Sequence, residues 1–402
     1  KFMFIDSQDR LKDIEKENSH LTFITHNFCI KEPNFYYFDE ILVIGKQICD
    51  STGFTSFEAN PEDIFSIIYT SGNTGTPKGV MLSHKNIVSQ LHDINKLIDL
   101  PKGEVALSLL PLAHIFERTV MSYYLSRGIS IYFVDDVLNV ANLMKIVKPT
   151  IMTVVPRLLE KIFNKIKAQI LEKPFFSRVI ASLAFSYALK ENLDKSSLLF
   201  KIYDKLVYSK FREIFGSRVE KLVSGGAPLS KEIAQFFVNI GVPIYQGYGM
   251  TEFSPVVSTN YPNANKVGSC GKVIPSAQIK ITPNNELLVR GDSLMLGYLN
   301  QEELTKNTID SDGWLHTGDV AHLDEDGYLF IKSRIKDIFK TSTGEYVNAV
   351  EIEQKLSKNR YIEFAVVISQ NRKYTTALLF VDKEKYENAK KLNKNLTIEE
   401  YY

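Results

Sequence analysis

The sequence has 402 residues, of which 44% are hydrophobic and 24% are charged, and its formal net charge is +1. This length and composition predict a globular chain with more than one core, and they exclude a disordered or collagen-like protein. A net charge this close to zero gives no overall field that would attract a polyanion, so we expect no nucleic-acid partner. An anionic ligand must then be held by local groups.

The three cysteines, Cys29, Cys49 and Cys270, lie far apart and form no CxxC pair. This spacing argues against a zinc site or a disulfide framework and favours buried, inert thiols in a reducing compartment, for which we expect the cytoplasm. No apolar run reaches the roughly 18 residues that span a bilayer. The strand-like start KFMFID and the open ending KLNKNLTIEEYY lead us to expect a sequence cut from a longer protein at both ends.

From residue 60 to residue 260, short apolar runs rich in β-branched residues alternate with amphipathic helical patterns. This alternation predicts an α/β fold, with a mostly parallel sheet covered by helices. Ser83 is placed to cap a helix through residues 86–98, and Ser230 to open a helix that stops at Gly241. The expected strands cover residues 65–70, 129–134, 149–156 and 242–247.

A longer helical pattern covers residues 165–215 and mixes aromatic side chains with Lys201, Lys205, Lys210 and Arg212. An amphipathic surface helix of this kind can lie on an anionic membrane. It can equally pack on the sheet and expose a solvated basic face. The pattern therefore leaves peripheral contact with a membrane surface open.

After about residue 265 the pattern changes to short strands and turns, which predicts a β-rich part of the chain. Asp326 and Gly327 supply the turn of an expected hairpin. The acidic runs DSDG and DEDG lack the alternating ligands and distant glutamate of a calcium loop, so we interpret them as turns. The expected strands here cover residues 277–282, 283–291 and 327–333.

The strongest single motif is IIYTSGNTGTPKGVMLS, residues 67–83. Its glycines let the backbone approach a ligand closely, its hydroxyl and amide side chains supply donors, and Lys78 supplies a charge. This composition is typical of a phosphate cradle. A Walker-type loop needs GK[ST] at the start of a helix, whereas Lys78 follows Pro77 and leads into a strand-like run. The loop is therefore predicted to join two strands.

Two further motifs lie beyond the loop. Residues 224–230 (SGGAPLS) lie between a strand and a helix, where ligands bind in open α/β sheets. Residues 245–255 (YQGYGMTEFSP) follow the next strand. With residues 313–353, which begin GWLHTGDV, these motifs closely resemble the adenylate-forming enzymes, the superfamily of acyl-CoA synthetases, luciferases and peptide-synthetase adenylation domains. The family's loop usually reads YTSGTTGxPKG, and Asn73 replaces one of its threonines here.

The resemblance implies a domain organisation. A large N-terminal AMP-binding domain would cover residues 1–335, with mostly parallel sheets flanked by helices and a β-rich subdomain over residues 265–335. The start of a small α+β mobile domain would cover residues 336–402, with its hinge at Lys336. In relatives a further lysine late in that domain takes part in adenylation, and we expect this sequence to stop before it.

The resemblance also implies the ligands, ATP, Mg²⁺ and coenzyme A as co-substrate, and the residues that bind them. Tyr248 would lie against the adenine, Thr251 would donate to the α-phosphate and Asp319 would accept the ribose hydroxyls. Arg334 would reach the ribose or phosphate. The implied nucleotide-binding set is Thr70, Ser71, Gly72, Asn73, Thr74, Gly75, Lys78, Gly225, Gly226, Ala227, Gln246, Gly247, Tyr248, Gly249, Thr251, Asp319, Arg334, Lys336 and Lys340.

The resemblance names a smaller catalytic and metal set within the site. Glu252, with Thr70, would hold Mg²⁺. Lys340, together with Gly344, would meet ATP or coenzyme A after the second domain rotates. The implied catalytic residues are Lys78, Thr251, Glu252, Arg334 and Lys336.

Residues 111–119 (PLAHIFERT) and 154–163 (VVPRLLEKIF) resemble the long-chain acyl-CoA synthetases, and His114 would either shape the acyl and phosphate region or pack as a core residue. The implied function is an AMP-forming acid–thiol ligase that turns a fatty acid into acyl-AMP and then into acyl-CoA. An acyl carrier protein ligase, a ligase for shorter or aromatic acids, and a nucleotide-binding pseudoenzyme remain alternatives.

Overall fold

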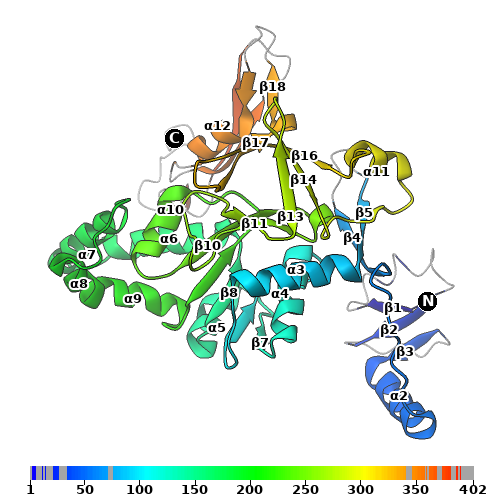
Figure 1. The fold of residues 1–402 in the computed structure, drawn as a ribbon. Coiled ribbons are helices and arrows are strands. Elements are labelled where there is room, and N and C mark those ends of the chain that lie inside the picture. The colour runs from blue at the N-terminus through cyan, green and yellow to red at the C-terminus, as the bar shows by residue number, and fades with distance from the viewer. Residues whose placement is uncertain are drawn as a thin grey trace. The chain divides into compact units, whose positions relative to one another are not determined.

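The structure of the protein is a computed structural model (Figure 1). It describes residues 2–5, 11, 14, 21–26, 34–70, 76–340, 346–357, 359, 362–368, 374–381, 386–387 and 390. The chain divides into two compact units, Lys1–Asn60 and Pro61–Tyr402.

The first unit holds a small parallel sheet and one helix. Strands β1 (Phe2–Ile5), β2 (Thr22–Thr25) and β3 (Phe35–Tyr37) pair in that order, as the strand-like start of the sequence predicts for β1. Helix α2 (Phe38–Thr52) follows directly after β3. Cys49 on this helix is exposed, so the expectation that the cysteines are buried is wrong for it, whereas Cys270 in the second unit is buried.

A seven-stranded sheet forms the centre of the second unit, in the order β12-β11-β10-β9-β8-β6-β7. The five strands from β10 to β7 run parallel, and β11 and β12 are antiparallel additions at one edge. The predicted α/β fold is therefore confirmed. The strands are β6 (Val105–Ser108), β7 (Ser130–Phe133), β8 (Ile151–Val154), β9 (Lys221–Ser224), β10 (Ile244–Gly249), β11 (Val256–Thr259) and β12 (Lys272–Val273).

Neighbouring residues of each strand point to opposite faces of the sheet, so both faces carry apolar side chains that must be buried. Helices cover both faces. Ala106 and Ile151 pack with Tyr123 and Tyr124 under the first two helices, whereas Met152 on the other side joins the main core. The helices are α3 (His84–Leu97), α4 (Ile115–Ser126), α5 (Val140–Val147), α6 (Pro156–Leu171) and α10 (Lys231–Asn239).

The predicted helix starts agree with the structure. The Ser83 hydroxyl accepts a hydrogen bond from the Asn86 amide at the start of α3, as expected. Ser230 is the N-cap residue of α10, as predicted, although its side chain makes no capping hydrogen bond. Gly241 follows α10 with φ +86°, a conformation that suits glycine at the end of a helix.

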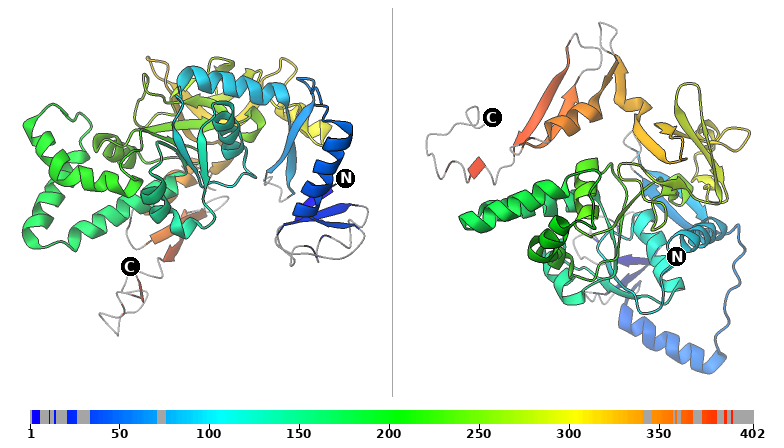
Figure 2. Two further views of the ribbon diagram at one scale, coloured as in Figure 1. Left: turned by 90° about the horizontal axis from the view of Figure 1, so that it is seen from below. Right: turned by 60° about the vertical axis from the view of Figure 1, so that its left-hand side comes forward.

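The predicted helical insertion is present and lies at the end of the second unit that is remote from β13–β17 (Figures 1 and 2). It consists of α7 (Phe175–Ala188), α8 (Leu198–Tyr203), a π-helical turn (Asp204–Tyr208) and α9 (Ser209–Arg212). None of the described helices combines the length and the apolar character that crossing a membrane needs.

The β-rich part of the chain forms two more sheets. One is antiparallel, with the order β13-β14-β16-β17, and the other joins β15 to the hairpin of β4 and β5. The predicted turn between β16 and β17 is present, with Gly327 at φ +77°. The elements are β4 (Ile64–Thr70), β5 (Lys78–Ser83), β13 (Ala277–Ile281), β14 (Glu286–Gly291), β15 (Gly297–Tyr298), α11 (Glu302–Thr308), β16 (Leu315–Leu323) and β17 (Leu329–Arg334).

The remaining described elements belong to the last part of the chain. Strands β18 and β19 form one antiparallel pair, and β20 and β21 form another. The domain boundary expected at residue 336 stays a prediction. The elements are β18 (Ile338–Lys340), β19 (Tyr346–Asn348), α12 (Ala349–Leu356), β20 (Ile362–Ile368) and β21 (Thr376–Val381).

Candidate active site

A cavity of about 400 Å³ opens at the carboxyl edge of the central sheet. Its wall comes from the residues that follow β6, β8, β9 and β10, and from the first turn of α4. In parallel α/β sheets this edge is where loops diverge and ligands bind. The lining residues are Leu110, Pro111, His114, Ile115, Phe116, Glu117, Val155, Val223, Ser224, Gly225, Gly226, Gly247, Tyr248, Gly249, Met250, Thr251, Pro255, Val256 and Thr259.

Six of the implied nucleotide-binding residues and His114 therefore come together in one cavity. Gly225 and Gly226 follow β9, Gly247, Tyr248 and Gly249 end β10, and Thr251 lies just beyond. The implied residues Gln246 and Ala227 are neighbours of this set in sequence but do not line the cavity.

Two glycines at this site lie in close contact with their neighbours. A Cβ atom on Gly249 would lie 2.0 Å from the carbonyl oxygen of Pro255, so no other residue fits that backbone. A Cβ atom on Gly225 would lie 3.3 Å from the ring of Phe116, which therefore rests directly on the glycine backbone. Phe116 was not predicted as a site residue.

Tyr248 links the cavity to the antiparallel sheet. Its hydroxyl donates a 2.5 Å hydrogen bond to Oδ2 of Asp319 on β16, and Arg334 Nε lies 3.2 Å from Oδ1 of the same carboxylate. Asp319 is only 3% exposed, and burial raises its pKa although Tyr248 and Arg334 both favour the ionised form. A carboxylate has about four acceptor positions, so two can still accept ligand hydroxyls.

Glu252 and Lys78 meet at a tyrosine that the motifs did not indicate. The Tyr298 hydroxyl donates a 2.8 Å hydrogen bond to Oε1 of Glu252, and Lys78 Nζ lies 5.3 Å from the centre of the same ring. Tyr298 lies on β15, which pairs with β5, the strand that begins at Lys78. Tyr298 thus contacts both implied catalytic residues, which lie 174 positions apart in the sequence.

The predicted phosphate loop joins β4 to β5, which confirms that it connects two strands. Thr70 and Lys78 are direct register partners at the base of this hairpin. Five implied residues of the loop lie outside the described part of the chain, so their placement is not known: Ser71, Gly72, Asn73, Thr74 and Gly75.

Lys336 lies exposed in the 3₁₀ turn Ile335–Asp337, directly after Arg334 at the end of β17. Lys340 ends β18, and its side chain lies outside the described part of the structure, as does Gly344. Lys336 does not line the cavity.

A buried carboxyl group braces the first turn of α4. Glu117 is 1% exposed, and its two oxygens accept hydrogen bonds of 2.5 Å from Ser108 on β6 and from Thr153 on β8. Burial raises the pKa of Glu117. These bonds tie the turn that carries His114 and Phe116 to the edge of the sheet.

Comparison with known families agrees with this geometry. A family model described as AMP-binding enzyme matches residues 1–299, and one described as AMP-binding enzyme C-terminal domain matches residues 336–400. The chain belongs to the AMP-binding enzyme family. The resemblance noted from the motifs is thereby confirmed.

Similar curated proteins share about a third of the residues of this AMP-binding enzyme. Long-chain-fatty-acid–CoA ligase ACSBG2 of Xenopus laevis is 34% identical over 371 residues, which cover 87% of this chain and 50% of that protein. Long-chain-fatty-acid–CoA ligase FadD15 of Mycobacterium bovis is 34% identical over 339 residues, 82% of this chain and 56% of that protein. The chain thus spans about half the length of these relatives.

Solved structures support the fold of this AMP-binding enzyme. ATP-bound MatB from Rhodopseudomonas palustris matches with a TM-score of 0.70 at 20% identity, over 99% of this chain and 73% of that one. The O-succinylbenzoate coenzyme A synthetase of Bacillus subtilis, in complex with ATP and magnesium ion, matches with a TM-score of 0.65 at 20% identity, over 97% and 76%. Both likenesses concern the fold alone.

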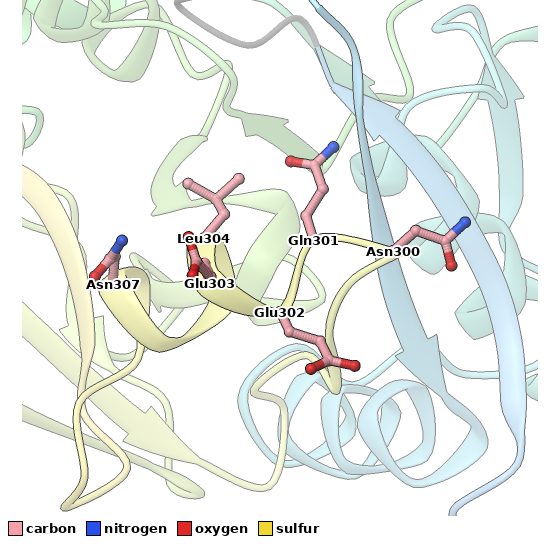
Figure 3. A pocket seen from close by; sticks show the side chains of 6 residues that line it. All are labelled: Asn300, Gln301, Glu302, Glu303, Leu304 and Asn307. Atoms are coloured by element: carbon pink, nitrogen blue, oxygen red, sulfur yellow. The ribbon is translucent and has the colours of Figure 1, made fainter.

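A second hollow of this AMP-binding enzyme, of about 590 Å³, lies beside α11 and is a poor candidate for the nucleotide (Figure 3). All its lining residues come from one short stretch, and none of them is basic. They are Asn300, Gln301, Glu302, Glu303, Leu304 and Asn307. A polyphosphate needs cations or free backbone amides, so we assign the site to the cavity at the sheet edge.

Proposed function

We propose that the protein is an ATP-dependent long-chain fatty acid–CoA ligase. It would join a fatty carboxylate to AMP with release of pyrophosphate, and then pass the acyl group to the thiol of coenzyme A. The observation that carries this proposal is the Tyr248–Asp319–Arg334 chain beside a cavity lined by Gly225 and Thr251. The curated relatives, named as long-chain-fatty-acid–CoA ligases, support the choice of acid and acceptor.

The cavity suits an adenosine phosphate because its polar and apolar groups are separated. The Tyr248 ring and the glycine backbone of residues 225–226 offer a flat surface for the adenine. Asp319 does not line the cavity but is hydrogen-bonded to Tyr248, which does, and we assign its carboxylate to the ribose hydroxyls. Phe116, Ile115 and Val155 add an apolar wall on which an acyl chain can lie.

In the first step the carboxylate attacks the α-phosphorus in line while pyrophosphate leaves. The enzyme must hold two anions together and stabilise charge on the phosphoryl oxygens. We assign the α-phosphate contact to the Thr251 hydroxyl, and neutralisation of the departing pyrophosphate to Lys78 and the loop residues 71–75. Arg334, 61% exposed beside Asp319, can reach the ribose or the phosphate.

The residues near Glu252 fit a magnesium ion that arrives with the nucleotide. The described hydrogen bond to Glu252 uses only Oε1, and Mg²⁺ commonly takes one or two carboxylates together with substrate phosphates. When bound, the ion would act as a Lewis acid on the phosphates. Among the residues that the structure describes, no group of three acidic, histidine or cysteine residues forms a complete metal cage. We propose Glu252 and Thr70 as the protein ligands.

In the second step the coenzyme A thiol must reach the mixed anhydride from another direction. A second domain that turns about Lys336 would present a new face, which includes Lys340, to the acyl-adenylate. The exposed turn Ile335–Asp337 after β17 is suitably placed for such a hinge. We also propose a cytoplasmic location with peripheral contact to a membrane, in which long-chain fatty acids dissolve.

An ATP–pyrophosphate exchange assay over acids from acetate to stearate tests the proposal, followed by a choice of coenzyme A or acyl carrier protein as acceptor. We expect exchange that is strongest with long-chain acids, and a thioester with coenzyme A. Exchange only with short or aromatic acids, or transfer only to the carrier protein, would show that the protein belongs to another class of ligase. Nucleotide binding without any exchange would identify a pseudoenzyme.

A further inference from the structure

Helix α7 is apolar on two opposite faces. Its inner residues, Ala181, Ala184, Phe185 and Ala188, are buried in the main core. A surface helix of a globular domain normally has a single apolar face, which packs inward. The outer residues of α7 are nevertheless large and apolar, share one face by their spacing, and are 43% to 81% exposed: Phe175, Phe176, Val179, Ile180 and Leu183.

The neighbouring helix repeats this feature. Helix α8 and the π-helical turn after it carry four apolar side chains that are 44% to 76% exposed: Leu198, Leu199, Ile202 and Leu206. The two helices touch, since the hydroxyls of Tyr187 and Ser197 lie 3.3 Å apart and the rings of Tyr187 and Tyr203 lie 5.6 Å apart. We call these nine exposed side chains the outer surface. The packing of the described residues does not explain why these exposed side chains are apolar.

The charge of this region points to an anionic partner. The helical insertion, residues 165–215, contains ten lysine and arginine residues against five aspartate and glutamate residues, a net charge of +5, whereas the whole chain carries +1. A basic group borders the outer surface, since the Arg178 guanidinium lies 5.9 Å from the centre of the Phe175 ring. Lys201 and Lys205 are exposed on and just after α8.

A lipid bilayer fits this combination better than a nucleic acid. Nucleic acids bind basic grooves through phosphate contacts and would leave nine aliphatic and phenylalanine side chains in water. Helices that lie in the bilayer interface combine lysine and arginine with phenylalanine and leucine, and they bind best to anionic lipids. The outer surface supplies the phenylalanine and leucine side chains, and Arg178, Lys201 and Lys205 on the same helices and the π-helical turn supply the basic ones.

We propose that the outer surface of α7 and α8 docks on an anionic phospholipid bilayer. Phe175, Phe176 and Leu198 enter the boundary between headgroups and acyl chains, and the bordering lysine and arginine side chains lie beside lipid phosphates. This inference rests on the peripheral membrane contact proposed above, and it names the surface and the lipid class. It needs neither ATP nor acid, so it is separable from the ligase chemistry.

Co-sedimentation of the full chain with vesicles, in the absence of nucleotide and fatty acid, tests the proposal. We compare vesicles of phosphatidylcholine alone with vesicles of phosphatidylcholine and phosphatidylglycerol. The expected result is binding to the anionic vesicles that falls as salt is raised, because the Debye length shortens. Failure to bind anionic vesicles, or equal binding to both kinds, would overturn the proposal.

Three double variants separate the two helices and the charge: Phe175→Ser with Phe176→Ser, Leu198→Ser with Leu199→Ser, and Lys201→Glu with Lys205→Glu. Each should weaken binding to anionic vesicles by about tenfold or more. The matched control is Val137→Ser with Leu138→Ser, which removes apolar side chains that are 65% and 93% exposed in the 3₁₀ turn after β7. The control should bind like the wild type.

Circular dichroism and light scattering complete the test. All the substituted side chains are exposed, so each variant should keep the melting curve of the wild type and remain able to exchange pyrophosphate in the absence of vesicles. If the serine variants bind vesicles as the wild type does, the surface assignment is wrong. If they change the mass of the protein in solution and leave vesicle binding intact, the outer surface is a contact between copies of this chain.

Discussion

The cavity at the sheet edge and the outer surface of α7 and α8 are built on opposite principles. In the cavity each contact is specified by a partner, as with Gly249 against the Pro255 carbonyl and Tyr248 against Asp319. On the outer surface no described partner covers the apolar side chains, and any residue of similar polarity would serve. A site for one molecule needs fixed geometry, whereas a surface for a fluid bilayer needs only composition.

This contrast predicts that small changes in the cavity have large effects, while drastic changes on the outer surface leave the chemistry untouched. The four changes below test the cavity side in order of decreasing effect.

The largest expected effect is that of Glu252→Ala. Removal of a main electrostatic group costs about 2.7–4 kcal/mol of transition-state stabilisation, so pyrophosphate exchange should fall by about 10²–10³-fold. Tyr298→Phe is the matched control, since it removes only the hydroxyl group that donates a hydrogen bond to Glu252. Its rate of pyrophosphate exchange should fall far less. An exchange rate in Glu252→Ala equal to that of the wild type would remove Glu252 from the proposed metal site.

The second change is Asp319→Asn, measured by calorimetric titration with AMP. Hydrogen bonds to a charged group contribute about 1.5–3 kcal/mol, so affinity should drop by about 10-fold to 150-fold. Tyr248→Phe keeps the ring and removes one donor to Asp319, and we expect a smaller loss. If AMP binds to Asp319→Asn as well as to the wild type, the ribose assignment fails.

The third change is Gly249→Ala, measured by thermal and urea unfolding. A methyl group 2.0 Å from a backbone oxygen forces the chain to shift, which costs about 1–3 kcal/mol of stability. Gly45→Ala on α2 is the control, because a Cβ atom there meets nothing within 4 Å and alanine favours helix. That control should be neutral or slightly stabilising. A Gly249→Ala protein as stable as the wild type would show that this backbone can relax.

The smallest effect concerns Glu117→Gln and appears in the pH dependence of stability. The folded pKa of Glu117 lies above its ordinary value of 4.5, so its contribution to stability is present below that value and is lost as pH rises through the folded pKa. Glutamine does not titrate, so the stability of the variant relative to the wild type should increase with pH over this window. If the difference in stability between Glu117→Gln and the wild type does not change with pH, the pKa of this carboxyl group is not raised on folding.

The sequence predicts the glycine and tyrosine part of the cavity well, because Gly225 follows β9 and Tyr248 lies at the end of β10, and these two parallel strands end at the same edge. It does not predict that Tyr298 joins Glu252 to Lys78, since this depends on the pairing of the two-residue strand β15 with β5. Periodicity likewise cannot tell which apolar face of α7 points inward, because small buried residues alternate with large exposed ones.

The pairing of β15 with β5 has a consequence for the order in which the protein is assembled during synthesis. A hairpin such as β4–β5 is marginal by itself, and two of the buried residues that pack on it, Met295 and Tyr298, lie more than 200 positions later in the chain. Chains emerge from the ribosome at roughly 5–20 residues per second, so on the order of ten seconds or more pass between the synthesis of the hairpin and that of its third strand, β15. The β4–β5 hairpin, although it is made long before β15, therefore gains its third strand and these two packing residues only late in synthesis.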